Sequence, residues 1–143
     1  MKDLDWSNLS FGYRQTDYNV RCYYRDGKWG EIEVCSDEYL KLHMAATCLH
    51  YGQEAFEGLK AYRCPDGKVR VFRMDENAKR LQSTCRGILM PEVPTEMFEE
   101  MVKKVVRLNQ EWIPTYESGA TLYIRPLLIG TSAQVGVHPS KEY

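Results

Sequence analysis

Two segments with the pattern of β-hairpins constrain the fold more than any other feature of the sequence. In the clearer one, residues 59–64 and 69–73 are rich in strand-forming side chains and flank the sequence Pro65-Asp66-Gly67. Proline sets the backbone at the first corner of a turn, and glycine accepts the positive φ at its end. This pattern predicts a strand, a tight turn and a returning strand.

The other hairpin pattern begins after Asp17. Residues 25–28 (RDGK) have turn chemistry, and residues 29–34 are typical of a returning strand. Two neighbouring hairpins favour an antiparallel sheet over a parallel one. The alternating positions that fall on one face of the first strand are Tyr18, Val20, Cys22 and Tyr24.

Two helices are predicted after the hairpins. We expect Asp75 to cap the first helix and Gly87 to mark its last turn. We expect Thr95 to cap the second, in which Glu99 and Glu100 each have a lysine four residues later. The apolar positions with helical spacing are Ala78, Leu81, Cys85 and Ile88 in the first helix, and Met97, Phe98, Met101, Val102, Val105, Val106 and Trp112 in the second.

A last strand is predicted at residues 121–129, interrupted by Pro126. Proline cannot donate to a strand ladder, so we expect an edge position or a bulge there. Strands, two helices and another strand indicate an α+β fold with two layers, an antiparallel sheet of hairpins packed against two helices. We interpret residues 1–143 as one domain in which residues 1–16 form an irregular arm.

Composition excludes several classes of protein. Hydrophobic residues make up 43% and charged residues 27%, as in globular proteins, and a net charge of -1 does not favour nucleic-acid binding. No run of 18 apolar residues predicts a membrane span, and the first residues lack a secretory signal. The five unevenly spaced cysteines are typical of reduced, mostly buried thiols, so we expect a cytoplasmic protein.

One pair of side chains is suited to binding a carboxylate. Tyr123 and Arg125 are two residues apart on the predicted last strand, so their side chains leave the same face. A phenol beside a guanidinium can grip a carboxylate through several hydrogen bonds. From the residues alone, an ordinary surface pair on a half-exposed sheet fits the pattern equally well.

Other candidate positions are weaker when only the residues are considered. Residues 51–58 (YGQEAFEG) predict a loop whose backbone approaches another group closely, although a plain structural turn is the simpler interpretation. His43, Cys48 and His50 have no common zinc spacing, so we expect no metal site. Arg80 lies off the apolar stripe of its helix, and periodicity alone predicts that it is solvated.

Four ordered blocks resemble the branched-chain amino acid aminotransferases, which are fold type IV enzymes of pyridoxal 5'-phosphate. The blocks are residues 50–62 (HYGQEAFEGLKAY), 72–81 (FRMDENAKRL), 118–131 (SGATLYIRPLLIGT) and 134–137 (QVGV). They occur in the order and spacing of the family, and the likeness extends over residues 17–143. It implies the amino-terminal small domain of such an enzyme.

The resemblance also implies roles for individual residues. Arg80 corresponds to the arginine that holds the cofactor phosphate, which reverses the solvated interpretation. Phe56 and Gly58 correspond to residues that line the substrate side of the cofactor, where leucine, isoleucine or valine is accepted. Tyr123 and Arg125 correspond to residues of the substrate pocket that take the distal carboxylate of glutamate. We therefore expect Arg80, Tyr123 and Arg125 to face one cavity.

Further positions match residues that close the pocket, and some of these reach across a dimer interface. They are Tyr51, Val135, Gly136 and Val137, so the resemblance implies a homodimer. The implied reaction moves an amino group between leucine, isoleucine or valine and 2-oxoglutarate, which gives branched-chain 2-oxo acids and glutamate.

The lysine that carries the cofactor lies in the family's carboxy-terminal domain, beyond Tyr143. We therefore expect no catalytic residue in this chain, a carboxy-terminal domain as its partner, and no transamination by the chain alone. Two alternatives stay open. One is another fold type IV enzyme, a D-amino acid aminotransferase or an aminodeoxychorismate lyase. The other is a non-catalytic carboxylate-binding domain, which the missing lysine favours.

Overall fold

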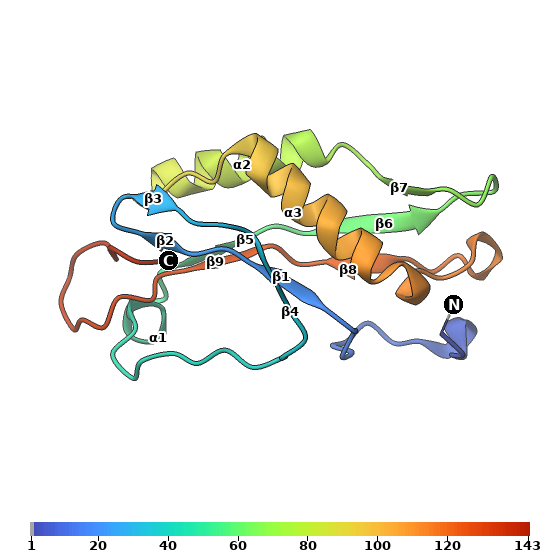
Figure 1. Cartoon of the computed structure of the whole chain (residues 1–143), viewed down its shortest axis with the longest axis horizontal. Coiled ribbons are helices and arrows are strands. Elements are labelled where there is room, and N and C mark those ends of the chain that lie inside the picture. The colour runs from blue at the N-terminus through green and yellow to red at the C-terminus, as the bar shows by residue number, and fades with distance from the viewer. Residues whose placement is uncertain (1) are drawn as a thin grey trace.

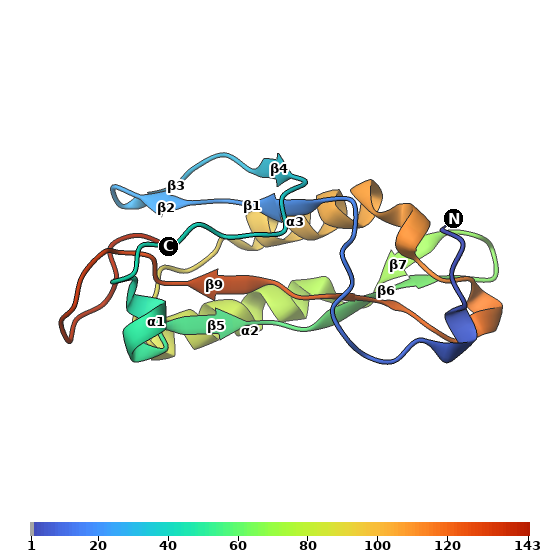
Figure 2. The same ribbon diagram turned by 90° about the horizontal axis from the view of Figure 1, so that it is seen from below.

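A computed structural model describes residues 2–143 of the chain as an α+β fold. Helices α2 (Met74–Gly87) and α3 (Thr95–Leu108) cover one side of a set of short antiparallel strands (Figure 1). Figure 2 shows the opposite side, where β5 (Glu54–Phe56) and β9 (Leu127–Ile129) lie in front of α2. The predicted fold class, antiparallel hairpins packed against two helices, is confirmed.

The central strands form one long antiparallel pair with an interruption in its middle. β5 pairs with β9, and β6 (Leu59–Arg63) lies between β7 (Val69–Val71) and β8 (Leu122–Ile124). β5 continues into β6 and β8 continues into β9, so both long strands break at the same level, at residues 57–58 and 125–126. The hairpin predicted at residues 59–73 is confirmed, as is the predicted break in the last strand at Pro126.

The hairpin predicted after Asp17 is also present, but it is divided into two short ladders. β1 (Asn19–Arg21) pairs with β4 (Glu33–Cys35), and β2 (Tyr24–Arg25) pairs with β3 (Lys28–Trp29). The turn residues Asp26 and Gly27 have φ values of 52° and 77°. Positive φ at both central residues matches the twist of hairpin strands, which explains the Asp-Gly sequence.

Both helices were predicted, but the two expected caps are wrong. Arg73, with a φ of 44°, precedes α2, so Asp75 lies inside the first turn and its carboxylate faces Lys79 at 3.5 Å. Pro94 precedes α3, so Thr95 is its first helical residue. Helix α2 thus begins two residues earlier than expected and α3 one residue earlier, and neither has a side-chain cap. Acidic groups near the positive helix end still favour the start of α2.

The core lies between the helices and the strands. The apolar stripes bury Ala78, Leu81 and Cys85 on α2 and Phe98, Val102 and Val106 on α3, as predicted. Ile88 does not belong to this stripe, because α2 ends at Gly87 and the side chain is 42% exposed. Trp112 also lies outside α3, in the 3-10 turn η2 (Gln110–Trp112).

The cysteines are free thiols, but the prediction that most of them are buried is wrong. Cys85 alone is buried, and the other four are half-buried.

Between residues 2 and 143, every helix is too short or too polar to traverse a lipid bilayer. Helix α1 (Thr47–Tyr51) was not predicted, because its five residues are too few to show a helical period.

The segment before β1 is mostly irregular, with one 3-10 turn, η1 (Trp6–Asn8). In Figure 2 this arm, in dark blue, crosses the strands on the side away from α2. Its far end is fastened by Asn109, whose side chain accepts from the Tyr18 amide at 3.1 Å and donates to the Tyr18 carbonyl at 2.9 Å. Phe11 of the arm meets the ring of Tyr123 edge to face, with centroids 5.3 Å apart.

Candidate functional site

The candidate site is built around the interruption between β5 and β6. Ala55, Glu57 and Leu59 point toward the helices and are at most 6% exposed, whereas Phe56 points outward and is 58% exposed. Alternation places Gly58 on the outward side with Phe56. A Cβ at Gly58 would lie 2.5 Å from the Tyr123 hydroxyl oxygen, so only glycine leaves room for this tyrosine.

This geometry revises the predicted loop at residues 51–58. Tyr51 ends α1, Gly52 follows it with a φ of 59°, and Glu54–Phe56 form β5, so the segment is not one loop. The simple-turn interpretation also fails. The close approach of the backbone to another group occurs at Gly58, where the phenol of Tyr123 lies against the chain.

Tyr123 and Arg125 form the expected couple on the outward face. The Arg125 Nε donates to the Tyr123 hydroxyl at 3.0 Å. The Arg125 guanidinium also lies over the Phe56 ring, 4.3 Å from its centroid. A ring and a phenol therefore hold the arginine, and no carboxylate within residues 2–143 forms an ion pair with it, so its positive charge is not offset within the couple.

Arg80 belongs to a different cluster, on the side of the strands that faces α2. Its Nε and Nη2 donate to the two carboxylate oxygens of Glu57 at 2.8 and 2.6 Å. Asn77, one turn earlier on α2, donates to the Glu57 Oε2 at 2.9 Å. Glu57 is 3% exposed, whereas the Arg80 side chain is 68% exposed. A buried carboxylate thus anchors an arginine that reaches into solvent.

The electrostatics of this cluster are dominated by the ion pair. Burial by itself would raise the pKa of the Glu57 carboxyl. The hydrogen bonds from Arg80 and Asn77, together with the positive charge of Arg80, outweigh burial and lower that pKa below its ordinary value. Glu57 raises the pKa of Arg80 in turn. Both groups are therefore ionised at neutral pH.

The structure brings Phe56, Gly58, Tyr123 and Arg125 together and places Arg80 apart from them, so the expectation that Arg80, Tyr123 and Arg125 face one cavity is not met within this chain. Phe56 and Tyr123 lie on the outward face, whereas Arg80 binds Glu57 on the inward face. The two clusters are joined through the backbone at residues 57–58, where Asn77 also approaches the Gly58 carbonyl at 3.4 Å. A ligand that contacts both Arg80 and Arg125 must therefore extend around residues 57–58, from one face of the strands to the other.

The positions expected to close the pocket lie at the other end of β5 and β9. Tyr51 is the last residue of α1, and residues 131–141 form a loop beside it, joined by a bridge between Ala46 and Ala133. Val135 is 72% exposed and Val137 is 95% exposed. Gly136 lies between them. These residues form an exposed apolar rim at the α1 end of the molecule.

Sequence reasoning missed three residues of these clusters. Phe11 was assigned only to an irregular arm, although its ring packs on Tyr123. Glu57 and Asn77 were not singled out. A signal for Glu57 was available, because alternation between Ala55 and Leu59 places an acidic side chain on a buried face. Such a residue requires a basic partner, and Arg80 is the exposed base that reaches it.

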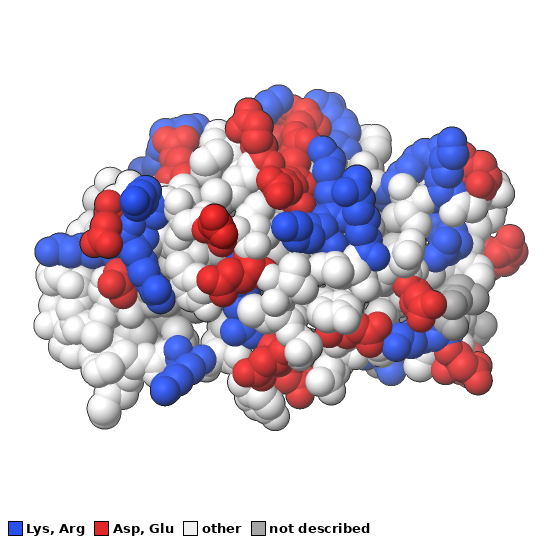
Figure 3. All heavy atoms as spheres, viewed as in Figure 1, with Lys and Arg blue, Asp and Glu red and all other residues white. Residues whose placement is uncertain are grey.

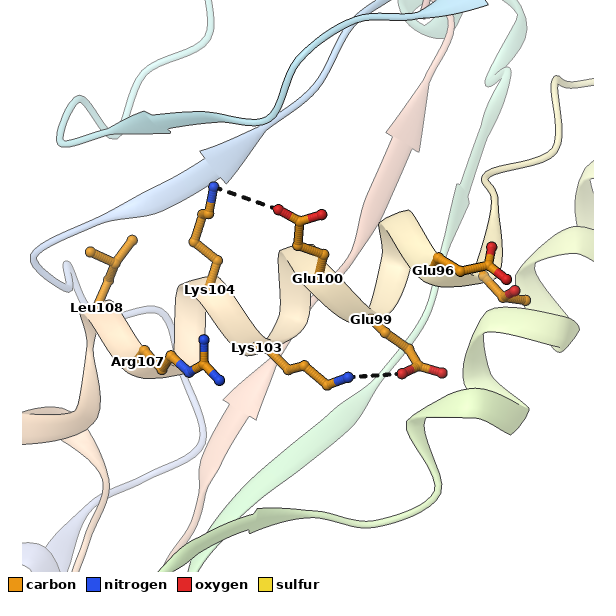
Figure 4. Close-up of a pocket in the computed structure, with 8 residues that line it drawn as sticks. Glu96, Glu99, Glu100, Lys103, Lys104, Arg107 and Leu108 are labelled. Carbon is orange, nitrogen blue, oxygen red and sulfur yellow. Dashed lines mark hydrogen bonds and ion pairs between the residues drawn. The ribbon is translucent and has the colours of Figure 1, made fainter.

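A separate surface hollow of about 640 Å³ follows the exposed side of α3 (Figure 4). The predicted i,i+4 pairs are confirmed there, with Glu99–Lys103 at 3.0 Å and Glu100–Lys104 at 3.9 Å. The charges offset one another, which is typical of a solvated helix face. Within residues 2–143, no group of three or more His, Cys, Asp or Glu side chains is arranged to hold a metal ion.

Comparison with known proteins gives a consistent set of relatives. No protein-family model matches the chain. The chain is 52% identical over 143 residues to the branched-chain-amino-acid aminotransferase of Haemophilus influenzae, and 46% identical over 143 residues to that of Helicobacter pylori. All of this chain is aligned in both cases, but only 42% of each relative. The chain therefore spans less than half the length of the curated relatives that it matches.

Solved structures lead to the same group. The branched-chain amino acid aminotransferase from Escherichia coli is 26% identical to this chain, with a TM-score of 0.59 over 89% of this chain and 39% of the other. Another solved branched-chain amino acid aminotransferase, complexed with N-(5'-phosphopyridoxyl)-L-glutamate, is 28% identical, with a TM-score of 0.61 over 87% of this chain and 37% of the other. The fold and the sequence thus agree on one set of relatives, and again the likeness covers a part of them.

Proposed function

From the membership of this chain in the branched-chain aminotransferase family, whose amino-terminal part it matches, we propose that it supplies one wall of an aminotransferase site. The reaction moves the amino group between leucine, isoleucine or valine and 2-oxoglutarate. The cluster of Phe56, Tyr123 and Arg125 carries the proposal, because it combines an apolar ring with an uncompensated guanidinium. An apolar substrate and a second, acidic one need both features in one place.

Pyridoxal 5'-phosphate is the cofactor of the proposed enzyme, and Arg80 fits its phosphate. The guanidinium is exposed, permanently charged and held from behind by Glu57, so one edge is free for an anion. When bound, the cofactor supplies an electron sink at the substrate α-carbon. The lysine that binds the cofactor is assigned to a carboxy-terminal domain outside residues 1–143, so this chain contributes binding and orientation only.

On the substrate side, the residues divide the work by polarity. Phe56 and Gly58 offer an apolar surface to a branched side chain. Tyr123 and Arg125 bind the distal carboxylate of glutamate, because the phenol orients the guanidinium and both can donate to oxygen. Support comes from the solved relative whose ligand joins a phosphopyridoxyl group to L-glutamate.

The proposed enzyme is a cytoplasmic homodimer, with the carboxy-terminal domain as a further partner of this chain. Tyr51, Val135, Gly136 and Val137 are assigned to the closure of the pocket, some of them against the second subunit. Exposed apolar side chains at this end support the assignment, since large apolar groups are rarely left uncovered together. In Figure 3 the region at lower left, where α1 and the last loop lie, carries few charged side chains.

The test compares substrates in the intact protein that contains this chain. L-Leucine with 2-oxoglutarate should give turnover, and D-alanine should give none, whereas the 143-residue chain alone should be inactive. Preference for D-alanine would identify a D-amino acid aminotransferase instead. Carboxylate binding without any turnover by the intact protein would identify a binding domain. Turnover by the isolated chain would contradict the absence of a catalytic residue.

A further inference from the structure

We infer that Glu57 is a positioning residue, which fixes the Arg80 guanidinium so that its outer edge faces the phosphate of the cofactor. The inference rests on the proposed function, because it takes Arg80 as the phosphate ligand. It goes beyond the proposed function, in which Glu57 is named only as the partner of Arg80, because it makes the affinity for the phosphate depend on Glu57.

The two hydrogen bonds leave Arg80 one orientation. Nε and Nη2 bind separate oxygens of Glu57 at 2.8 and 2.6 Å, which is the parallel arrangement of a guanidinium and a carboxylate. Because the guanidinium is planar, two such bonds fix both its direction and its plane. A single bond would fix neither.

Glu57 is itself buried and held by several hydrogen bonds. It is 3% exposed, and besides the two bonds from Arg80 it accepts one from the Asn77 side chain at 2.9 Å. Both of its oxygens are therefore occupied and screened from solvent. Glu57 is not available to bind a ligand or to exchange a proton with one, so any effect on a ligand passes through Arg80.

The other edge of Arg80 is the one that meets solvent. The side chain is 68% exposed, and none of residues 2–143 accepts a recorded hydrogen bond from its Nη1. Its neighbour Lys79 differs, since it binds Glu76, whose side chain is 48% exposed, and both partners can move together. Of Lys79 and Arg80, only Arg80 is bound to a buried carboxylate. An anchored donor binds an anion without first losing its freedom of rotation.

Glu57 has a second, opposing effect, because its negative charge offsets that of Arg80. A phosphate would approach from the solvent side, where water and salt screen the carboxylate behind the guanidinium. The loss of a fixed hydrogen-bonding edge is not screened in this way. We therefore expect orientation to outweigh charge, so that removal of the Glu57 carboxylate weakens phosphate binding.

The experiment uses the intact protein and two ligands that differ only in the phosphate, pyridoxal 5'-phosphate and pyridoxal, each titrated by absorbance. In Glu57→Gln the side chain keeps its shape, but its amide nitrogen faces an Arg80 donor and one bond is lost. We expect pyridoxal 5'-phosphate to bind about tenfold more weakly and pyridoxal to bind as in the parent. The control, Glu76→Gln, removes a carboxylate of α2 that does not touch Arg80, and should change neither affinity.

The Arg80→Gln variant separates this inference from the proposed function. If Arg80→Gln does not weaken pyridoxal 5'-phosphate more than pyridoxal, Arg80 is not the phosphate ligand, and both fail. If Arg80→Gln does so but Glu57→Gln binds as the parent, the positioning role alone is wrong. Equal weakening of both ligands by Glu57→Gln would show a merely structural role. Tighter binding of pyridoxal 5'-phosphate would show that the charge of Glu57 outweighs its orienting effect.

Discussion

An exposed arginine lies at each face of the interrupted strands, Arg80 of α2 at the inward face and Arg125 at the outward face, and the two are held in opposite ways. On the inward side, Arg80 is bound through two hydrogen bonds to a buried carboxylate. On the outward side, Arg125 is held by the hydroxyl of Tyr123 and the ring of Phe56, neither of which carries a charge. The first arginine is thus fixed and partly neutralised, and the second keeps its full charge.

This difference indicates what each arginine is suited to bind. A fixed donor fits a ligand that stays in place, such as a cofactor phosphate. A charged donor on an apolar support fits a group that is present in one substrate and absent in the next, because ring and phenol also tolerate an apolar neighbour. The same residue type therefore serves two purposes through its partners.

The largest expected effect separates the two arginines by substrate. In the intact protein, Arg125→Gln should lower kcat/KM for glutamate by about a hundredfold, because a desolvated carboxylate loses its charged partner. For leucine the loss should be slight. Arg80→Gln should instead lower kcat/KM equally for glutamate and leucine, since both substrates need the cofactor. Steady-state rates with each donor measure this, and equal losses with Arg125→Gln would contradict the assignment.

A second prediction concerns the support of Arg125. A Cβ at Gly58 would meet the Tyr123 hydroxyl at 2.5 Å, so Gly58→Ala should push the phenol away from its bond with Arg125. We expect about a tenfold loss of kcat/KM with glutamate. Tyr123→Phe in the Gly58→Ala background serves as the control, because it removes the contact. If Gly58→Ala lowers kcat/KM for glutamate as much in the Tyr123→Phe background as in the parent, the two residues act independently and the prediction is wrong.

A third prediction tests the arm. The Phe11 ring is 84% exposed and meets Tyr123 edge to face, so it restrains the phenol while adding little to the core. An aromatic pair contributes about 1 kcal/mol. Phe11→Ala should therefore lower kcat/KM for glutamate by about fivefold. Tyr13→Ala, a similarly exposed arm residue that binds Glu38, is the control and should have no such effect. Equal effects would assign the loss to the arm in general.

Much of the fold could be predicted from the sequence, because the local patterns agree with the packing. The hairpin at Pro65-Asp66-Gly67, the break at Pro126 and the apolar stripes of α2 and α3 all occur as expected. The cap predictions failed because α2 begins two residues earlier, after Arg73, and α3 begins one residue earlier, after Pro94, and neither residue has a side chain that marks an N-cap.

The candidate site could be predicted only in part. Tyr123 and Arg125 share a face because they are two residues apart on one extended segment, and that is a local property. The partners of Glu57 are not local. Arg80 and Asn77 lie 23 and 20 residues away on another element, so their meeting depends on how α2 packs against the strands. The ring of Phe11 reaches Tyr123 across an even longer separation.

The smallest expected effect uses pH to sharpen the contrast between the two faces. The pKa of Glu57 in the folded chain lies below its ordinary value of 4.5, so folding favours the ionised carboxylate. Its contribution to stability is fully present above pH 4.5 and is lost as the pH falls through the lower, folded pKa. The difference in unfolding free energy between the parent and Glu57→Gln should therefore narrow below pH 4.5. Denaturant unfolding at neutral pH and at successively lower pH measures it, with Arg125→Gln as the control, because the partner of Arg125 is an uncharged phenol. A difference that stays constant into strong acid would mean that Glu57 is not held as an ion on the inward face.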